Sequence, residues 1–394
     1  MKILHFITIL LITINLYSCS QDRVVETSNA SDTTKVSKLQ EPVKTPVDTF
    51  NTQLSHLLAG KTLPYRIPNI TIYGVSNYNS NIRTKWDQLQ SKRLDLISSW
   101  ISSRFNYAST PDTAFVFYPF SGGDFLHVHT LYPDANTYFL VAREDVGIIP
   151  NLFLKDSNFV LKYLHDVDYV LRDIYTRSYF ITMNMHIDTK QSTFINGMLP
   201  VLFWTLGNLD FEILKLNYYK KNASINQLEK IDTLANGIKP TLVELKIRKK
   251  GELKNRTLYY YSCDISDNGF LADSLSYNYL LNTVPKGCNA MVKSASYLLH
   301  YINFSKIRSL ILDRSKILIQ DDTGIPFKYF KSDVWNRELY GIYEHPIADF
   351  DSSVFQYDLH MAYKDTTMYK GRLNFSMGYH WGSKNQNELI FIKK

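Results

Sequence analysis

Apolar residues recur at spacings of three and four positions along much of the chain, which is the pattern of helices that bury one face. Phe50, Leu54 and Leu58 show this pattern first, and Gly60 follows as the residue type that commonly ends a helix. The same criterion predicts helices at about residues 50–59, 86–105, 158–175, 178–185, 195–206, 290–302 and 305–312.

Shorter apolar segments predict strands at about residues 69–75, 114–119, 137–142, 210–218, 241–249, 256–265, 316–320, 373–381 and 388–392. The segment 114–119 is continuously apolar, as in strands buried on both faces of a parallel sheet. Residues 210–218 and 241–249 alternate instead, and the turn Lys250-Gly251 predicts a hairpin. We therefore expect an α/β protein with a mixed, mostly parallel sheet of Rossmann-like βα units and added antiparallel hairpins, the last of them at the C-terminus.

Two loop sequences, one in each half of the chain, are similar to each other. Strand 137–142 leads into EDVGIIP at 144–150, and strand 316–320 leads into DDTGIP at 321–326. Each loop has a carboxylate pair, one spacer and Gly-Ile before a proline. The upstream segments FVFYPF (115–120) with Asp124 and LYYYSC (258–263) with Asp264 also resemble each other loosely. An internal duplication of two βα units is one interpretation, and chance similarity is the other.

The first residues have the composition of an export signal. Lys2 precedes an apolar run at 3–16, which is too short for a stable membrane span. The run ends in Leu-Tyr-Ser before Cys19, which resembles a bacterial lipobox with a cysteine that becomes lipidated and anchors the chain. An ordinary signal peptide with a chance cysteine is the alternative. Since Ser20 and not aspartate follows, we expect an outer-membrane lipoprotein on the periplasmic face or the cell surface.

The rest of the chain is divided by composition. After a signal peptide at 1–18, residues 19–47 are polar and lack an apolar period, so we expect a disordered tether. The body then has an N-terminal α/β half at 48–240 and a C-terminal α/β half at 241–394, either separate or continuous as one domain.

Charge and aromatic content narrow the class of partner. The 394 residues include 44 Lys and Arg against 37 Asp and Glu, and the net charge of +7 forms no dense basic stripe. Phosphate backbones require such a stripe, so we expect no nucleic-acid partner. The 28 Tyr and 22 Phe exceed ordinary usage. Tyrosine-rich surfaces suit polar ligands such as sugars, although tyrosine also fills large β-rich cores.

Cysteine usage leaves two interpretations open. Beyond Cys19 the chain contains only Cys263 and Cys288, an even number in an oxidising compartment. A disulfide between them would contribute roughly 3–4 kcal/mol if it is unstrained. Two separately buried thiols are the other interpretation.

Acidic residues follow several predicted strands. In open α/β sheets, ligands bind beyond the carboxyl ends of the strands, and paired carboxylates there serve as acid and base or as a seat for a divalent metal. Each of them can equally cap a helix or a turn. The candidate catalytic residues are Glu144, Asp264, Asp321, Asp322 and His300, and the candidate binding residues are Asp124, Lys293 and Tyr297. No metal ligand set is predicted.

Other motifs carry weaker signals. On a helix at 290–302, Lys293, Tyr297 and His300 would share a polar face that closes over the loop at 321–322. A G-x-S-x-G nucleophile elbow is absent. His127-Val128-His129 would diverge on a helix, which favours a surface pair over a metal site. The loop at 120–124 is neither a Walker A loop nor a dinucleotide fingerprint, so we expect no cofactor.

Five segments together resemble a family of uncharacterised bacterial lipoproteins of the Bacteroidota type. They are FYPFSGGD (117–124), VAREDVGIIP (141–150), VKSASYLLH (292–300), IQDDTGIP (319–326) and FSMGYHW (375–381). Family versions read YPFSG-D, LEPVG, K-S-A-S-Y-L-x-H and QDDSGIP. Glu144 matches this pattern, whereas Asp145 stands where proline often occurs. The resemblance covers the chain from about residue 50 to the C-terminus. It implies that this part is one evolutionary unit, and it implies no particular activity.

Two functions remain open on these grounds. One is a membrane-anchored envelope lipoprotein that binds a glycan or another envelope component in a cleft at the strand ends. The other is a metal- or carboxylate-dependent hydrolase or lyase that acts on an extracellular polymer.

The lipobox interpretation predicts that Cys19→Ser abolishes lipidation and moves the protein out of the membrane fraction, because the acylated cysteine is the expected anchor. Cell fractionation followed by a high-salt wash measures this. A variant that stays with the membranes after the wash would show that another element holds the protein there.

Overall fold

The computed structural model describes residues 45–63, 72–105, 114–177, 179, 194–222, 224–234, 237–381 and 386–394. Lys44–Lys394 form one compact unit, and a single sheet runs through both of the predicted halves. The predicted signal peptide, the lipobox, most of the tether and nearly all of the predicted helix 178–185 lie outside the described residues. No described helix is both long and apolar enough to cross a bilayer.

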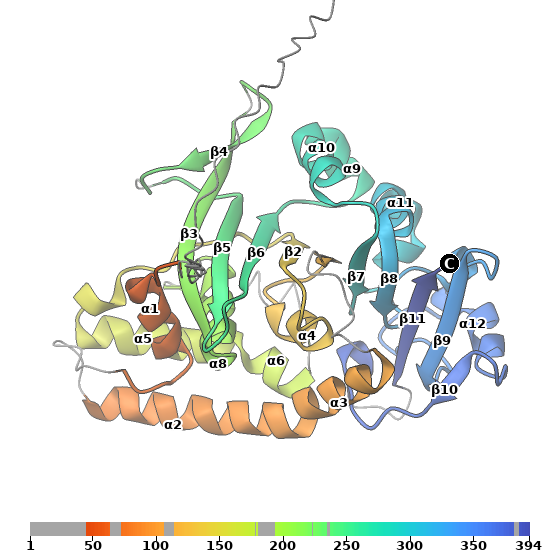
Figure 1. Ribbon diagram of the computed structural model, residues 1–394, viewed down its shortest axis with the longest axis horizontal. Coiled ribbons are helices and arrows are strands. Elements are labelled where there is room, and N and C mark those ends of the chain that lie inside the picture. Colours follow the sequence, from red (N-terminus) through yellow and green to blue (C-terminus); the bar gives the residue numbers. More distant parts are fainter. Residues whose placement is uncertain are drawn as a thin grey trace, which may run out of the picture. The chain divides into compact units, whose positions relative to one another are not determined.

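One mixed sheet of eleven strands organises the fold, in the order β10-β9-β11-β8-β7-β1-β2-β6-β5-β3-β4 (Figure 1). The strands are β1 (Phe115–Pro119), β2 (Thr137–Ala142), β3 (Phe211–Asn222), β4 (Gln227–Ile231), β5 (Leu242–Lys249), β6 (Asn255–Ser262), β7 (Cys288–Val292), β8 (Ser315–Gln320), β9 (Trp335–Gly341), β10 (Tyr369–Gly371) and β11 (Asn387–Lys393). The five central strands, β8, β7, β1, β2 and β6, run parallel to one another. On one side β5, β3 and β4 add antiparallel pairings, and on the other β11 lies antiparallel to β8 and β9.

Helices cover both faces of this sheet. They are α1 (Thr49–Leu58), α2 (Ile72–Leu89), α3 (Asp95–Arg104), α4 (Phe125–Leu131), α5 (Ser157–Val170), α6 (Arg172–Arg177), α8 (Leu199–Asn208), α9 (Asp267–Ala272), α10 (Ser274–Thr283), α11 (Ser305–Arg314) and α12 (Tyr357–Ala362). Apolar residues of α1 to α8 form one core with one face of the strands, and those of α9 to α12 form a second core with the other face. The side chains of consecutive strand residues therefore pack in opposite cores. Val116 and Tyr118 belong to the first core, and Phe117 belongs to the second.

The chain leaves the centre of the sheet in two directions. From β1 it passes through α4 to β2 on one side, and from β7 it passes through α11 to β8 on the other side. Right-handed crossovers in opposite directions place their helices on opposite faces, and α4 and α11 do belong to opposite cores. The loops that follow β1 and β7 therefore diverge, and neither crossover helix fills the space between them. Open sheets of this kind form ligand-binding crevices at such points.

The structure confirms an α/β protein with a mixed sheet and corrects several sequence predictions. Parallel and antiparallel neighbour pairs of described strands are equally frequent, so the sheet is not mostly parallel: the parallel pairs are those of the five central strands and the edge pair β10–β9. The predicted helix 290–302 is instead the end of β7 followed by a loop, because its first apolar residues, Ala290, Met291 and Val292, lie inside the sheet. Within the predicted strand 69–75, residues from Ile72 onward are helical. Residues 373–381 form no strand, and β11 pairs with β8 and β9 instead.

Close packing of α1 against α8 yields a stability prediction. A Cβ at Gly207 on α8 would lie 2.3 Å from the backbone oxygen of Ser55 on α1. Backbone atoms cannot rotate away, so Gly207→Ala should lower the free energy of unfolding by about 1–3 kcal/mol.

Gly74→Ala on α2 is the matched control. Its Cβ would meet only the side-chain tip of Leu161, which can move. Alanine also favours a helix by up to about 1 kcal/mol, so this variant should stay near the wild-type stability. Urea unfolding of both variants measures the difference, and equal losses would contradict the packing argument.

Candidate functional site

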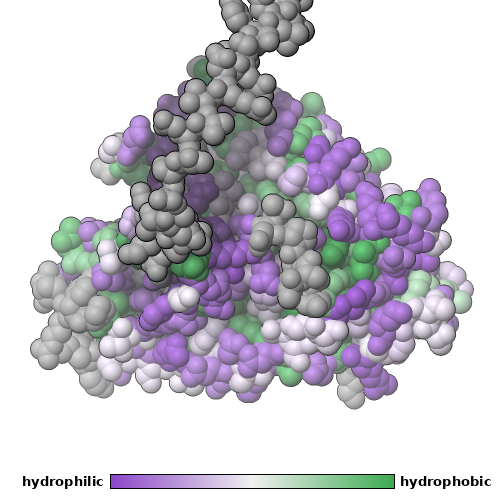
Figure 2. All heavy atoms as spheres, viewed as in Figure 1, coloured by the Kyte–Doolittle hydropathy of each residue, from purple (hydrophilic) through white to green (hydrophobic). Residues whose placement is uncertain are grey.

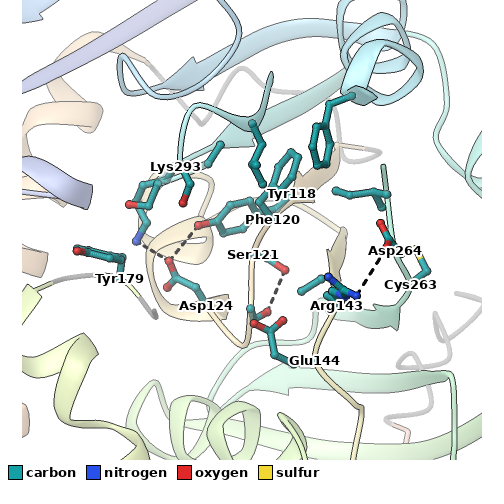
Figure 3. A pocket seen from close by; sticks show the side chains of 18 residues that line it. Tyr118, Phe120, Ser121, Asp124, Arg143, Glu144, Tyr179, Cys263, Asp264 and Lys293 are labelled. Carbon is teal, nitrogen blue, oxygen red and sulfur yellow. Dashed lines mark hydrogen bonds and ion pairs between the residues drawn. The ribbon is translucent and has the colours of Figure 1, made fainter. Parts of the chain in front are cut away.

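A cavity of about 220 Å³ lies at the carboxyl ends of the four neighbouring strands β7, β1, β2 and β6 (Figure 3). Each strand contributes residues at or just beyond its end to the lining, namely 120–122 and 124, 142–144, 263–265 and 293–296. Tyr179 and Phe304 complete the described lining together with Tyr118 and Leu298. The cavity therefore occupies the crevice that the strand topology creates.

A buried ion pair joins the loops after β1 and β7. Lys293 Nζ lies 2.6 Å from Asp124 Oδ2, and each side chain is only 2% exposed. Tyr118 on β1 donates its hydroxyl to the same Asp124 oxygen at 3.1 Å. The other oxygen accepts the backbone N–H of His127 at 3.1 Å, so Asp124 is also the N-cap of α4, and it lies 2.8 Å from His127 Nδ1. The carboxylate thus has four polar contacts, as a buried charge requires.

The electrostatics of this cluster are set by burial and by its partners. Burial alone would raise the pKa of Asp124, but His127 and Lys293 outweigh it and hold the pKa well below its usual range. Burial lowers the pKa of His127. A neutral imidazole can donate from Nδ1 to Asp124, so three neutral donors support the ammonium–carboxylate pair: the Tyr118 hydroxyl, and the backbone N–H and imidazole of His127.

Both histidines of the His127-Val128-His129 motif are buried, which corrects the expected surface pair. His127 supports Asp124, and His129 Nδ1 lies 2.9 Å from the hydroxyl of Tyr138 on β2. Their side chains diverge along α4 as expected for positions two apart on a helix. Among the described residues, no group of three His, Cys, Asp or Glu side chains is arranged to hold a metal ion.

Left-handed backbone conformations concentrate around the cavity. Phe120 has a φ of 62°, and Ser294, Ser296 and Tyr297 have φ of 54°, 53° and 56°. Only two other described non-glycine residues have a positive φ. Such conformations cost roughly 1–3 kcal/mol each and persist where surrounding contacts impose them, most often at functional sites.

The contacts that impose this loop come from the acidic residues after β8. Asp321 accepts the N–H of Ser294 on one oxygen and the N–H of Thr323 on the other, both at 3.0 Å. Asp322 accepts the hydroxyl of Tyr297 and lies 2.8 Å from His380 Nε2. Both carboxylates are buried and neither lines the cavity. The segment 293–300 therefore does close over the loop at 321–322, as a strained loop and not as a helix face.

Burial and the neighbouring charge of Asp322 raise the pKa of Asp321 to about 6. Burial and the Asp321 carboxylate also raise the pKa of Glu388, which lies on β11 between β8 and β9. Burial lowers the pKa of His300 to about 4. None of these three groups lines the cavity; they form a layer behind it, in which Asp321 supports the β7 loop through Ser294.

Glu144 and Asp264 do line the cavity, at the ends of the neighbouring strands β2 and β6 (Figure 3). Glu144 is 4% exposed, whereas the Asp264 side chain is 43% exposed. Burial raises the pKa of Asp264, but hydrogen bonding to Ser266 and the charge of Arg143 lower it more. Arg143 lies 4.0 Å from Asp264 and is largely exposed, so the lining includes one cation that is accessible to solvent.

Cys263 and Cys288 are separate buried thiols in this structure. Cys263 lies just beyond the carboxyl end of β6, whereas Cys288 lies at the amino end of β7. The strands β1 and β2 lie between β6 and β7 in the sheet. This placement excludes a bond between them in the folded chain.

Sequence reasoning found four of the five charged cavity residues, Asp124, Glu144, Asp264 and Lys293, and missed several of their partners. Tyr118 was not identified as a partner of Asp124, and His127 was considered only as a metal ligand, although an aspartate directly before a helix is a typical N-cap. Glu388 was missed inside the apolar strand NELIFI, where an isolated acid within an apolar run is the available signal. Phe304 reaches the cavity from a distant turn, for which the sequence offers no signal.

The ion pair yields a prediction about stability and its pH dependence. Lys293→Met should lower the free energy of unfolding at pH 7 by about 3–5 kcal/mol, because it leaves Asp124 buried without its ammonium partner. The folded-state pKa of Asp124 would then rise above its unfolded value. The penalty should therefore shrink as the pH falls from 7 towards 4, since the carboxylate can take up a proton.

In the wild type, the contribution of Asp124 to stability changes with pH in the opposite direction. The pKa of Asp124 is lower in the folded state, so its contribution is complete above its ordinary value of 3.8 and is lost as the pH falls below it. Lys221→Met breaks the partly exposed pair with Asp273 and is the matched control, with an expected cost of about 0–1 kcal/mol. Equal losses for both variants, or a Lys293→Met penalty that is constant with pH, would contradict this account.

Comparison with known proteins does not add a function to this geometry. No protein-family model matches the chain, and no curated protein matches it either. The cavity residues themselves carry the functional argument.

Proposed function

We propose that the protein binds a glycan, or a similar polyhydroxylated envelope component, through the cavity at the carboxyl ends of β7, β1, β2 and β6. The observation that carries this proposal is the mixed lining of one small cavity. Carboxylates at Glu144 and Asp264 and hydroxyls at Ser121, Ser294 and Ser296 stand beside aromatic rings. Sugars offer both hydroxyl groups and apolar C–H faces, so this combination suits them.

The size and the rim of the cavity agree with a ring-sized ligand. Its volume of about 220 Å³ is below the roughly 300–1,000 Å³ typical of sites for drug-sized molecules. Phe120 and Phe304 lie with their ring centroids 6.0 Å apart, and Tyr179 and Tyr379 lie 4.6 Å apart. One sugar ring in the cavity would lie beside the lining rings of Phe120, Phe304 and Tyr179.

The proposed setting is the outer membrane. A lipidated Cys19 followed by a polar tether would hold the body near the envelope surface, where glycans are abundant. The lipobox-like sequence and the polar composition of residues 19–47 support this part of the proposal.

A carboxylate-dependent hydrolase or lyase is the second candidate. The observation that favours it is the contrast between Glu144, which is buried, and Asp264, which is partly exposed with a lowered pKa, in one cavity. Acid–base pairs in glycan-cleaving enzymes use carboxylates in such unlike environments. In this case Glu144 would serve as the acid, and Asp264 would serve as the base or nucleophile.

We also propose that β1-α4-β2 and β7-α11-β8 are two related Rossmann-like βα units. Both end in a loop with a carboxylate pair, at 144–145 and 321–322, and both begin at the centre of the sheet. The strand that precedes β8 through a helix is β7, so the similarity noted for segment 258–263, which lies in β6, does not belong to this pair.

Asp264→Asn tests the binding proposal. The amide keeps the acceptor oxygen for the N–H of Ser266, so the melting temperature should change little. Binding of the oligosaccharide that the wild type selects on a glycan array should weaken at least tenfold in calorimetry, because a charge-assisted hydrogen bond to a sugar hydroxyl contributes about 1.5–3 kcal/mol.

Asp333→Asn is the control, since it changes an exposed aspartate away from the cavity. Unchanged affinity for the Asp264→Asn variant, or no binding to any array sugar, would refute the proposal. Glu144→Gln separates the two candidates: cleavage of the bound oligosaccharide that disappears in this variant, with binding retained, would favour the enzyme.

A further inference from the structure

A second cavity lies on the helical side of the molecule, between the C-terminal half of α2, the turn after it and α6. Its volume is about 460 Å³, and it shares no described lining residue with the cavity at the strand ends. Four cationic side chains line it, Lys85, Lys92, Arg93 and Arg172, and none of the described lining residues is acidic. Figure 2 shows the surface over α2, along the lower edge of the view, as mostly hydrophilic or intermediate.

Three of these cations lie on α2 and on the π-helical turn that directly follows it. Gln90–Leu94 form a π-helical turn between α2 and α3, and the N–H of Asp95 bonds to the oxygen of Gln90. Lys92 and Arg93 belong to this turn. An inserted π turn shifts the register of the following side chains, and such turns occur frequently at functional sites.

Two of the cations are held in place by the protein. Lys85 Nζ lies 2.6 Å from Asp168 on α5, which neutralises one charge. Arg93 donates to the carbonyl oxygens of Ile174, Tyr175 and Thr176 at the end of α6, at 3.4, 3.3 and 2.9 Å. These contacts fix Arg93 without cancelling its charge, because they use only backbone oxygens.

The other two are suited to contact a ligand. Lys92 is exposed on the π turn. Arg172 stacks over the ring of Tyr169, with 4.0 Å between its Cζ atom and the ring centroid, and donates to the carbonyl of Tyr169 at 3.0 Å. Stacking holds the plane of a guanidinium, and a held guanidinium matches the oxygens of phosphate and sulfate.

We propose that this cavity binds phosphate or sulfate ester groups, and specifically those of an anionic sugar. Lys92 and Arg172 contact the oxyanion, and Arg93 supplies fixed positive charge beside it, whereas the charge of Lys85 is neutralised by Asp168. The volume exceeds what one oxyanion needs, so the cavity has room for the sugar that carries it. Gln88 and Thr176 line the same space and offer an amide and a hydroxyl to its hydroxyl groups.

Isothermal titration calorimetry with the full chain tests this site. The probes are a sulfated disaccharide, its unsulfated counterpart and inorganic pyrophosphate. We expect the sulfated disaccharide to bind at least tenfold more tightly than the unsulfated one, and to weaken as the ionic strength rises because salt screens the attraction. Pyrophosphate that binds more tightly than the sulfated sugar would overturn the assignment to an anionic sugar and point to a free phosphate.

The double variant Lys92→Ala/Arg172→Ala should lose at least tenfold in affinity for the sulfated disaccharide. Lys316→Ala removes an exposed lysine from β8 and should bind as the wild type does. An equal loss for Lys316→Ala, or no loss for the double variant, would overturn the proposal by showing that net charge or another surface is responsible. Lys92→Ala alone keeps the Arg172–Tyr169 stack and should still lose at least threefold, which covers the case in which the double variant fails to fold.

Asp264→Asn separates this proposal from that for the cavity at the strand ends. It lies outside the lining of the cationic cavity and should leave sulfated-disaccharide binding unchanged. Loss of binding in Asp264→Asn would assign the anionic sugar to the cavity at the strand ends and overturn the second site.

Discussion

The ion pair between Asp124 and Lys293 is the interaction on which the site depends. These two residues follow β1 and β7, the two strands at which the chain turns away from the centre of the sheet in opposite directions. Loops at such a divergence have no helix between them to fix their distance. A charged contact of 2.6 Å, buried and supported by Tyr118 and His127, fixes it instead. Both side chains line the cavity, so this pair fixes the distance between two of its walls.

The acidic residues after β8 then determine the shape of one wall. Asp321 and Asp322 do not face the cavity, yet they hold the β7 loop in its left-handed conformation through Ser294 and Tyr297. Strain in the loop is therefore balanced by hydrogen bonds from buried carboxylates. The five segments 117–124, 141–150, 292–300, 319–326 and 375–381 all contribute residues to the cavity or to the layer behind it. The site is thus a cooperative assembly of loops from the whole length of the body.

The sequence allowed the type of fold and the edge of the sheet to be predicted, because continuous apolar runs and the polar residues that follow them are local signals. The bounds of β2 were predicted correctly, and β1, β5 and β8 within one residue. The loop 293–297 was mistaken for a helix because K-S-A-S-Y has good helical periodicity, and only the distant Asp321 and Asp322 impose its real conformation. The burial of His127 and of Glu388 was not predicted, because it also depends on contacts between distant parts of the chain. Such contacts join residues far apart in the sequence, and no local pattern encodes them.

The late entry of β7 into the middle of the sheet has a consequence for how the chain folds. Val116 on β1 pairs with Asn289 on β7, so the centre of the sheet is incomplete until most of the chain has been synthesised. Pairings between residues so distant in sequence form slowly, because the intervening chain must be ordered first. Until then β1 remains an apolar edge strand, which is prone to pair with other chains. A fragment that ends before β7 should therefore aggregate, because nothing covers the edge of β1 that β7 occupies in the complete fold.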